Sequence, residues 1–332
     1  MSLLRWGIAG ARSRSRQFIL GLNVLLKEGQ GHKIIAIAAQ EVSHAQFAAK
    51  VYNIPKIYDD YEKLALDTDI DIVFISTINS QRFDTAMLML RHGKHVLCET
   101  PMTMNWEQTK ELIIYAQSRK LFLMEDLACR CLPAYDFIRK ELASGNIGDV
   151  ASMELHIHFR VFNTQQLPIN QVKDIILDPL IHCLQFICLA YNNEKPTDIQ
   201  VFETNRQNSY KVVITVVIFY EGMRTAKILI HNLSHLPNQA RIFGNNGIMR
   251  VPQFWLPTKV EVSNRPAPLS FPVLQSNINE PFYGSSYPCE VTDVLTCIRH
   301  DLIENPKMTH DTSLLLAKLK DEICKQLDIV YS

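Results

Sequence analysis

The chain opens with a short apolar segment that runs directly into a glycine turn, Leu3-Leu4-Arg5-Trp6-Gly7-Ile8-Ala9-Gly10. Further short segments rich in Ile and Val follow at residues 33–39, 71–77, 95–98 and 121–124. Stretches typical of helices lie between them, at residues 43–51, 81–91 and 105–120. Strands that alternate with helices predict a parallel sheet covered on both faces. We therefore expect residues 1–125 to form a Rossmann-type nucleotide-binding domain.

After Asp149 the pattern changes to strand-like segments joined by turns such as Glu221-Gly222. We expect strands at residues 151–159, 197–203, 210–220, 224–231, 239–243, 247–251 and 259–262. Helical patterns cover residues 133–144, 179–190, 288–302 and 311–327. Residues 126–332 are thus predicted to be an α+β domain with a large, mostly antiparallel sheet that leaves one face open. The C-terminal helices are expected to pack back on the first domain.

Composition excludes some classes of partner. The 34 basic residues balance the 34 acidic ones, so neither nucleic acid nor an anionic membrane is expected as the main partner. No apolar run approaches the ~18 residues that a membrane-spanning helix needs. The eight cysteines lack the spacing of a zinc site, so no metal is expected. Reduced thiols and a start too short for a secretory signal predict a cytoplasmic location.

The first turn departs from the dinucleotide fingerprint Gly-x-Gly-x-x-Gly, because the stretch reads Gly10-Ala11-Arg12-Ser13-Arg14-Ser15 and keeps only the first glycine. In the fingerprint, the second glycine lets the backbone approach the pyrophosphate, and Arg12 stands there instead. Two interpretations remain open. Arg12, Arg14 and Arg16 supply cationic phosphate contacts, or they form a solvated surface on a loop that no longer binds a dinucleotide.

The end of the second strand is the other point that distinguishes cofactors, and here the chain has Gln40-Glu41. An acidic residue at this place accepts hydrogen bonds from the ribose of NAD, whereas an arginine favours the extra phosphate of NADP. Glu41 is the charge available for this role. The alternative is that Glu41 is an ordinary turn residue that faces solvent.

Several longer stretches, spread along nearly the whole chain, carry a family resemblance. They are Arg5-Trp6-Gly7-Ile8-Ala9, Ile54-Pro55-Lys56, His92-Gly93-Lys94-His95-Val96-Leu97-Cys98-Glu99, Leu121-Phe122-Leu123-Met124-Glu125, Gly145-Asn146-Ile147-Gly148-Asp149 and Tyr287-Pro288-Cys289-Glu290. The chain resembles the glucose–fructose oxidoreductase/inositol dehydrogenase (Gfo/Idh/MocA) family, and within it the branch of NADP-dependent dihydrodiol and D-xylose dehydrogenases. The resemblance implies reversible hydride transfer between NADP and a hydroxyl-bearing carbon of a diol, polyol or aldose.

The resemblance also implies a catalytic lysine in a Glu-Lys-Pro motif after the fifth strand. This chain has Glu99-Thr100-Pro101 at that place. Thr100 is neutral and short, so it cannot place a cation at the reacting oxygen. Loss of one group that stabilises an oxyanion commonly costs ~10²–10³ in rate. The expected consequence is an impaired or altered enzyme.

The family's second site motif matches Asp178-Pro179-Leu180-Ile181-His182. Residues four apart lie on one face of a helix, so Asp178 and His182 are expected to share a pocket. A histidine suits general acid/base work near neutral pH, with the aspartate orienting it. The alternative is purely structural: an aspartate before a proline makes a good N-cap and first residue of a helix.

For the cofactor, the resemblance implies contacts from Gly10, Arg12, Thr77, Asn79, Glu99 and Arg130. Other positions depart from the branch, which has arginines where this chain has Gln40 and His44, and a tryptophan where it has Ala128. NADP is the expected cofactor on resemblance, with Gln40 at the phosphate position.

Two hypotheses follow from this mixture of kept and lost residues. The chain is an NADP-dependent dehydrogenase in which His182 is the acid/base and Thr100 a weak ligand of the oxygen. Alternatively, it is a pseudoenzyme, a binding or scaffold protein that kept the fold and lost the chemistry. Both imply a homodimer formed through the open sheet face of the second domain, a property that the resemblance supplies.

Overall fold

The computed structural model describes residues 3–27, 31–158, 169–205, 212–232, 237–272 and 286–329. The chain divides into two compact units. The first consists of Met1–Leu132 with Val273–Ser313, and the second of Pro133–Pro272 with Leu314–Ser332. The first unit is therefore discontinuous in sequence. The expected boundary at residue 125 stays a prediction about independently folding domains.

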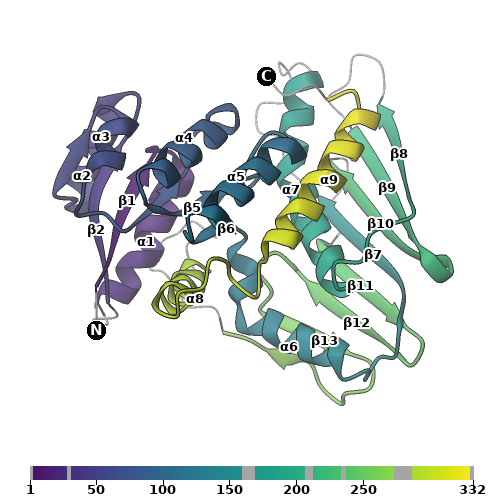
Figure 1. Cartoon of the computed structure of the whole chain (residues 1–332). Helices are drawn as coiled ribbons and strands as arrows, with labels where there is room; N and C mark the ends of the chain where they lie inside the picture. The colour runs from purple at the N-terminus through teal and green to yellow at the C-terminus, as the bar shows by residue number, and fades with distance from the viewer. Residues whose placement is uncertain are drawn as a thin grey trace. The chain divides into compact units, whose positions relative to one another are not determined.

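The first unit contains a six-stranded parallel sheet in the order β3-β2-β1-β4-β5-β6 (Figure 1). This is the strand order of a doubly wound dinucleotide-binding fold, so the Rossmann prediction is confirmed. The strands are β1 (Leu4–Ala9), β2 (His32–Ala38), β3 (Lys56–Tyr58), β4 (Ile72–Ile75), β5 (His95–Glu99) and β6 (Leu123–Asp126). The helices are α1 (Ser13–Lys27), α2 (Val42–Tyr52), α3 (Tyr61–Leu66), α4 (Asn79–Arg91), α5 (Trp106–Ser118) and α8 (Tyr287–Arg299), with a 3-10 turn at Ala128–Cys131.

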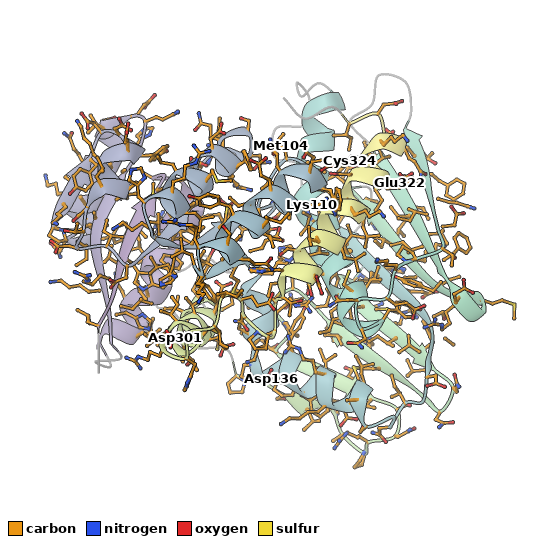
Figure 2. The ribbon with its side chains drawn as sticks, viewed as in Figure 1. Met104, Lys110, Asp136, Asp301, Glu322 and Cys324 are labelled. Atoms are coloured by element: carbon orange, nitrogen blue, oxygen red, sulfur yellow. The ribbon has the colours of Figure 1, made fainter. Side chains whose placement is uncertain are left out.

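Local chemistry explains why these segments form. Every residue of β4 is buried, as expected for a continuous apolar strand in the middle of a parallel sheet. Helix α5 begins after Asn105, whose side chain accepts a hydrogen bond from the amide of Gln108 at 2.9 Å. On the solvent side of α5, the Nζ of Lys110 lies 4.8 Å from the centroid of the Trp106 ring (Figure 2).

An aromatic cluster brings a distant part of the chain into this unit. The rings of Phe18 on α1 and Phe74 on β4 stack with centroids 4.0 Å apart. Tyr287, at the start of α8, meets the Phe18 ring edge-on at 5.3 Å. All three side chains are almost fully buried. This packing fixes the first turn of α8 beside α1 and the sheet, which matters for the buried acids described below.

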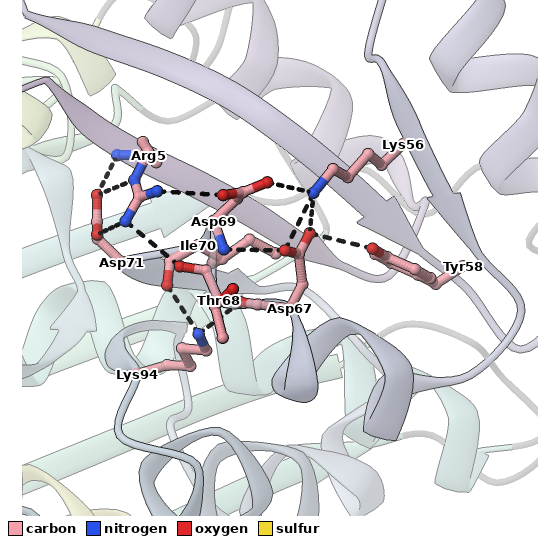
Figure 3. Close-up of polar contacts among 9 residues, drawn as sticks. All are labelled: Arg5, Lys56, Tyr58, Asp67, Thr68, Asp69, Ile70, Asp71 and Lys94. Atoms are coloured by element: carbon pink, nitrogen blue, oxygen red, sulfur yellow. Dashed lines mark hydrogen bonds and ion pairs between the residues drawn. The ribbon is translucent and has the colours of Figure 1, made fainter.

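The amino ends of the strands are joined by a network of charges and backbone groups (Figure 3). The Arg5 guanidinium donates to both carboxylate oxygens of Asp71, at 3.0 and 2.7 Å. The Lys94 ammonium donates to the carbonyl oxygens of Asp67, at 2.6 Å, and Ile70, at 2.9 Å. These bonds connect β1 to the segments that enter β4 and β5, and they help fix the register of the sheet.

The second unit contains an eight-stranded sheet in the order β14-β13-β12-β11-β7-β10-β9-β8. The neighbours are antiparallel except β7 and β10, which run parallel. In β9 every second residue is buried and the others are half-buried, so one face of the sheet is covered and the other is open. The predicted α+β fold with a mostly antiparallel sheet is confirmed. The strands are β7 (Val150–His158), β8 (Asp198–Asn205), β9 (Val212–Tyr220), β10 (Arg224–His231), β11 (Gln239–Gly244), β12 (Gly247–Pro252), β13 (Lys259–Val262) and β14 (Leu269–Ser270).

The helices of this unit are α6 (Pro133–Ala143), α7 (Ile169–Ala190) and most of α9 (His310–Gln326), with a 3-10 turn at Glu221–Met223. The prediction that a helix begins at Pro179 is wrong, because α7 begins at Ile169 and Pro179 lies inside it. Proline cannot donate a backbone hydrogen bond, which makes it typical of a helix start. Here the apolar side chains of Ile176 and Leu177, which are buried, favour continuation of the helix. The N-cap interpretation of Asp178 is therefore wrong as well.

Candidate nucleotide and acid–base site

The turn after β1 requires a glycine. Gly10 has a φ of +101°, and a Cβ on it would collide with the backbone oxygen of Ser76 after β4. The Gly10 amide donates a hydrogen bond to the carbonyl oxygen of Ala38 at 2.8 Å. The Ser15 hydroxyl donates to the carbonyl oxygen of Gly10 at 2.7 Å. The carboxyl ends of β1, β2 and β4 therefore meet closely at this turn, the place where ligands bind in doubly wound sheets.

A cavity with a volume of about 320 Å³ lies beside the turn, between the first part of α1 and helix α2. Three of its side chains are arginine or histidine: Arg12, Arg16 and His44. Its full lining is Ala11, Arg12, Ser13, Ser15, Arg16, Ile19, His44, Phe47, Ala48 and Tyr52. The first turn of α1 contains no acidic residue. A helix N-terminus flanked by arginines favours an anion, so the cavity fits a phosphate group.

The three arginines of the turn do not behave alike. Arg12 and Arg16 are exposed and line the cavity. Arg14 instead lies with its Nε 3.5 Å from Glu99 Oε1, and its side chain is only 18 % exposed. The structure thus separates the two interpretations of the arginines by residue: two of them face a cavity, and the third pairs with an acid at the end of β5.

Glu99 is held by three groups at the carboxyl end of β5. Its Oε2 lies 2.9 Å from Arg82 Nη2 and accepts the Ser76 hydroxyl at 2.9 Å. The other arm of the Arg82 guanidinium donates to the Pro101 carbonyl at 2.9 Å. Both partners fix the carboxylate in place beside Arg14. Glu99 therefore has a defined position at the carboxyl edge of the sheet.

The other residues expected to contact the cofactor are spread over the same unit. Gln40 is exposed after β2, and next to it Glu41 Oε2 lies 3.3 Å from the His44 Nε2. Thr77 is buried just before α4, and Asn79 is the first residue of that helix. Their role as cofactor contacts stays a prediction.

Arg130 also lies in the first unit, in the 3-10 turn after β6. Its side chain is buried, and its Nε donates to the backbone carbonyl of Lys307 at 2.6 Å. This bond joins the turn after β6 to the loop before α9. Arg130 has a structural contact of its own, and its role toward a cofactor stays a prediction.

Thr100, at the position of the expected lysine, is buried and follows β5. Its hydroxyl donates to Glu125 Oε1 at 2.8 Å, and the same oxygen accepts the Met102 amide at 3.0 Å. Because that oxygen serves both donors, the hydroxyl proton of Thr100 is directed toward Glu125. Thr100 Oγ1 can therefore accept a hydrogen bond from another group, but its own proton is already in use.

Asp178 and His182 lie one turn apart on α7 in the second unit. Their side chains are 3.8 Å apart, from Asp178 Oδ1 to His182 Nε2. The aspartate side chain is 47 % exposed and that of the histidine 7 % exposed. At this distance the two side chains are within ion-pair reach but beyond a hydrogen bond, and a catalytic role for the pair stays a prediction.

Sequence reasoning missed a pair of buried acids in the first unit. Asp126, the last residue of β6, is the register neighbour of Glu99, and its Oδ2 accepts the Tyr287 hydroxyl at 3.0 Å. Glu290, one turn further along α8, has no exposed surface. Burial raises the pKa of Asp126 to about 6, with Arg14 lowering it and Glu99 raising it. Burial and then the Asp126 charge raise the pKa of Glu290 well above its usual range.

One signal in the sequence could have indicated Asp126. It follows Glu125 directly at the carboxyl end of a predicted buried strand, where a second acid has no obvious structural reason. Glu290 carried no such signal, because helix periodicity does not reveal that this helix packs against a strand far away in the sequence. Perturbed buried acids at a strand end are typical of functional sites.

Over the residues described, no group of three or more His, Cys, Asp or Glu side chains is arranged to hold a metal ion. Within the same part of the chain, no helix has the length and apolar character that crossing a membrane requires.

Comparison with known proteins places this geometry in a family. Residues 4–127 match Gfo/Idh/MocA, described as an oxidoreductase family with an NAD-binding Rossmann fold. The trans-1,2-dihydrobenzene-1,2-diol dehydrogenase of Xenopus laevis is 31% identical over 329 residues, covering 98% of this chain and 99% of that protein. The enzyme of the same name from Danio rerio is 32% identical, covering 99% of this chain and 98% of that protein. The enzyme from Homo sapiens is 30% identical, with the same coverage of both chains.

Solved structures show the same fold at lower identity. KijD10, a 3-ketoreductase from Actinomadura kijaniata in complex with NADP and TDP-benzene, has a TM-score of 0.77 at 18% identity, covering 98% of both chains. The UDP-N-acetylglucosamine 3-dehydrogenase GnnA from Acidithiobacillus ferrooxidans also has a TM-score of 0.77, at 17% identity and 98% of both chains. With the full-length relatives above, these findings show that the chain belongs to the Gfo/Idh/MocA oxidoreductase family.

Proposed function

We propose that this chain is an NADP-dependent oxidoreductase of small hydroxyl-bearing compounds, such as diols, polyols or aldoses, and that Thr100 slows its turnover. The observation that carries the proposal is the basic cavity beside the Gly10 turn, at the carboxyl edge of a Rossmann sheet. The full-length relatives named as diol dehydrogenases support the substrate class.

The residues present fit the phosphates of a dinucleotide. Gly10 keeps the turn tight against Ser76, and the acid-free N-terminus of α1 points into the same region. Arg12, Arg16 and His44 would hold the phosphate groups at the cavity. Arg12 and Arg16, which line one cavity with His44 from the first turn of α2, would favour NADP over NAD. When bound, the nicotinamide ring supplies or accepts the hydride.

The protein's own part in the reaction is to hold the hydroxyl group and to move its proton. In the second unit, His182 would accept a proton, and Asp178 lies 3.8 Å from its Nε2, within ion-pair reach. The Thr100 hydroxyl donates its proton to Glu125, so Thr100 has no proton left to donate to the reacting oxygen. A neutral acceptor beside a carboxylate does not stabilise a developing oxyanion, so turnover is slow.

Calorimetric titration with NADP⁺ and NAD⁺ tests the cofactor. The wild-type chain should bind NADP⁺ more tightly, and Arg12→Gln or Arg16→Gln should weaken NADP⁺ binding by about tenfold to a hundredfold, since a charged hydrogen bond contributes about 1.5–3 kcal/mol. Arg91→Gln, an exposed change on α4, is the matched control and should leave the affinity unchanged. If wild-type protein binds neither nucleotide, the proposed cofactor is wrong.

A second function is favoured by one observation, the donation of the Thr100 proton to Glu125. On this alternative the protein binds a hydroxylated ligand on the same fold and catalyses nothing. Wild-type protein that binds NADP⁺ yet shows no nicotinamide absorbance change with any of a panel of diols and aldoses would favour the alternative. Measurable turnover with any of them would exclude it.

A homodimer through the open sheet face is part of the same proposal. Phe202, Thr215 and Leu229 lie in one row across β8, β9 and β10, and Phe202 is 56% exposed. Exposed apolar side chains on one sheet face favour association. Sedimentation velocity should therefore find a dimer, and Phe202→Glu should convert it to a monomer, whereas Ile114→Glu on α5 should not. A monomeric wild-type protein at micromolar concentration would contradict the dimer.

A cytoplasmic location completes the proposal. All eight cysteines lie in the described part of the chain, and none is joined in a disulfide. Seven of them are buried, among them Cys324 on α9 (Figure 2). Thiols of this kind are typical of a reducing compartment. Fluorescence microscopy of a tagged full chain checks the location.

A further inference from the structure

The buried acids at the end of β6 form a pair that needs a proton. Asp126 accepts the Tyr287 hydroxyl at 3.0 Å, and Glu290, one turn along α8 from Tyr287, is fully buried. Within the described residues, no N–H or O–H group donates to either oxygen of Glu290. Burial without a donor favours the protonated form of a carboxyl group, and the Asp126 charge nearby favours it further. Glu290 therefore carries the proton of the pair.

Charged and titratable groups reach this pair from every element packed against it. Arg14 on α1 attracts the Asp126 charge, and Glu99 on β5 repels it. On α8 itself, Asp293 repels the Glu290 charge, and Asp293 Oδ2 is paired with Lys307 Nζ at 3.0 Å. Other groups of the described residues near the pair include Tyr287 on α8, Cys131 in the turn after β6 and Cys98 on β5.

Arg14 connects the pair to the nucleotide turn. It lies in the first turn of α1, between Arg12 and Arg16, and its Nε is 3.5 Å from Glu99 Oε1. Of the groups that act on Asp126, Arg14 is the strongest that favours its ionised form. An anion near the turn would add negative potential and would compete for the Arg14 charge. Either effect makes the ionised form of Asp126 less favourable.

We propose that the Asp126–Glu290 pair is a proton-binding site coupled to the Gly10 turn, and that it takes up a proton when an anionic ligand binds there. The inference rests on the proposed function in one respect, since it takes the phosphates of NADP as the anion. Because the complex would hold more protons than the free protein, affinity should fall as pH rises through neutrality. The upper limit is about tenfold per pH unit for one whole proton.

Calorimetry in two buffers of different ionisation enthalpy measures this uptake directly. NADP⁺ titrated into the wild-type chain near neutral pH should give different heats in the two buffers, with the sign of proton uptake. Asp126→Asn removes the group that takes up the proton, so uptake should disappear while binding persists. Glu290→Gln exchanges the protonated acid for a neutral amide and keeps Asp126, so uptake should persist there.

Glu111→Gln on α5 is the matched control, because it removes one exposed acid of the same unit and should leave uptake unchanged. Equal heats in both buffers, with NADP⁺ clearly bound to the wild-type protein, would overturn the proposal. So would uptake that persists unchanged in Asp126→Asn.

A measurement without any cofactor separates this inference from the proposed function. The infrared spectrum of the wild-type chain at neutral pH should contain the carbonyl band of a protonated carboxylic acid, and the difference spectrum against Glu290→Gln should show that band lost. If NADP⁺ does not bind but the band is present, the proposed cofactor is wrong and the proton on the pair is supported. If the band is absent, the proton-binding pair is wrong whether or not NADP⁺ binds.

Discussion

Acidic side chains lie at both edges of the Rossmann sheet, but their partners differ between the amino edge and the carboxyl edge. At the amino edge, Lys56 Nζ lies 2.9 Å from Asp67 Oδ2 and 2.7 Å from Asp69 Oδ2, and the Tyr58 hydroxyl donates to Asp67 at 3.0 Å (Figure 3). Burial alone would raise the pKa of Asp67, but these hydrogen bonds, together with that from the Asp69 amide, lower it below its usual value. The acids of this edge are matched with cations.

At the carboxyl edge the balance is different. Glu99 has Arg82 and Arg14 beside it, but Asp126 and Glu290 share one buried region with each other. The pKa of Asp126 is raised to about 6 by burial, in the opposite direction from that of Asp67. Buried acids that are not matched by cations cost stability. The comparison teaches that the amino edge of the sheet is built for stability, with each acid beside a cation. The carboxyl edge, where the Gly10 turn lies, instead keeps buried acids whose pKa values are raised.

The largest expected effect comes from adding a cation to the carboxyl edge. Thr100→Lys would place an ammonium group next to Glu125, which in the wild-type chain accepts a hydrogen bond from the Thr100 hydroxyl. If the missing cation limits catalysis, turnover of diols or aldoses with NADP⁺ should rise by ~10²–10³, read as nicotinamide absorbance. Thr100→Met has similar length without the charge and should give no gain. A lysine variant that binds NADP⁺ but is no faster would show that more than this residue has diverged.

The second prediction concerns the pH dependence of stability at the same edge. Because the pKa of Asp126 is raised in the folded state, the folded chain binds more protons than the unfolded chain, and its free energy of unfolding falls as pH rises from about 4 to about 6. The raised Glu290 pKa extends this loss to higher pH. A shift of this size corresponds to the order of 2–3 kcal/mol for Asp126.

Urea unfolding at a series of pH values checks this slope. Asp126→Asn should flatten it, because the asparagine side chain does not titrate between pH 4 and 6. Glu111→Gln keeps both buried acids and should follow the wild-type curve. The free energy of unfolding of the wild-type chain could instead rise between pH 4 and 6 by the full amount expected of ordinary carboxylates. That result would mean that the two acids are not buried together.

The sequence could predict the features that depend on neighbouring residues, but not those that depend on contacts between residues far apart in the chain. The alternation of apolar and helical segments predicted the parallel sheet, and Gly10 predicted the tight turn. Strand β3 and helix α3 were missed, because they have only 3 and 6 residues and carry no long apolar pattern.

The side-chain partners at the carboxyl edge were not predictable. Arg14 was grouped with Arg12 and Arg16, since nothing in a local pattern shows that it turns toward Glu99. Tyr287 and Asp126 are 161 residues apart in the chain, so their contact depends on packing that no local pattern encodes. The candidate acid–base pair was placed on one helical turn correctly by its spacing, although the start of that helix was predicted wrongly.

A third prediction tests the amino edge, where a buried cation satisfies backbone groups. Lys94 is 7 % exposed, and its ammonium donates to the carbonyl oxygens of Asp67 and Ile70. Lys94→Met would leave two carbonyl groups without that donor, at about 1–3 kcal/mol for each group that stays dry. Thermal unfolding should show a clear loss of stability with NADP⁺ affinity unchanged, and Lys94→Arg should recover part of it. Weakened NADP⁺ binding in folded Lys94→Met would mean that the two edges are not independent.

The smallest expected effect comes from the exposed part of the same edge. Lys56 is 36 % exposed and pairs with the exposed Asp69 and with Asp67, whose side chain is 6 % exposed, so water and salt screen part of the attraction. Lys56→Met should lower the melting temperature by only about 1–3 °C, since exposed ion pairs contribute little to stability. The loss should shrink further in high salt and as pH falls through the lowered pKa of Asp67, because protonation removes the partner charge. A loss as large as that of Lys94→Met would show that the aspartates depend on charge balance as strongly as the buried acids of the opposite edge.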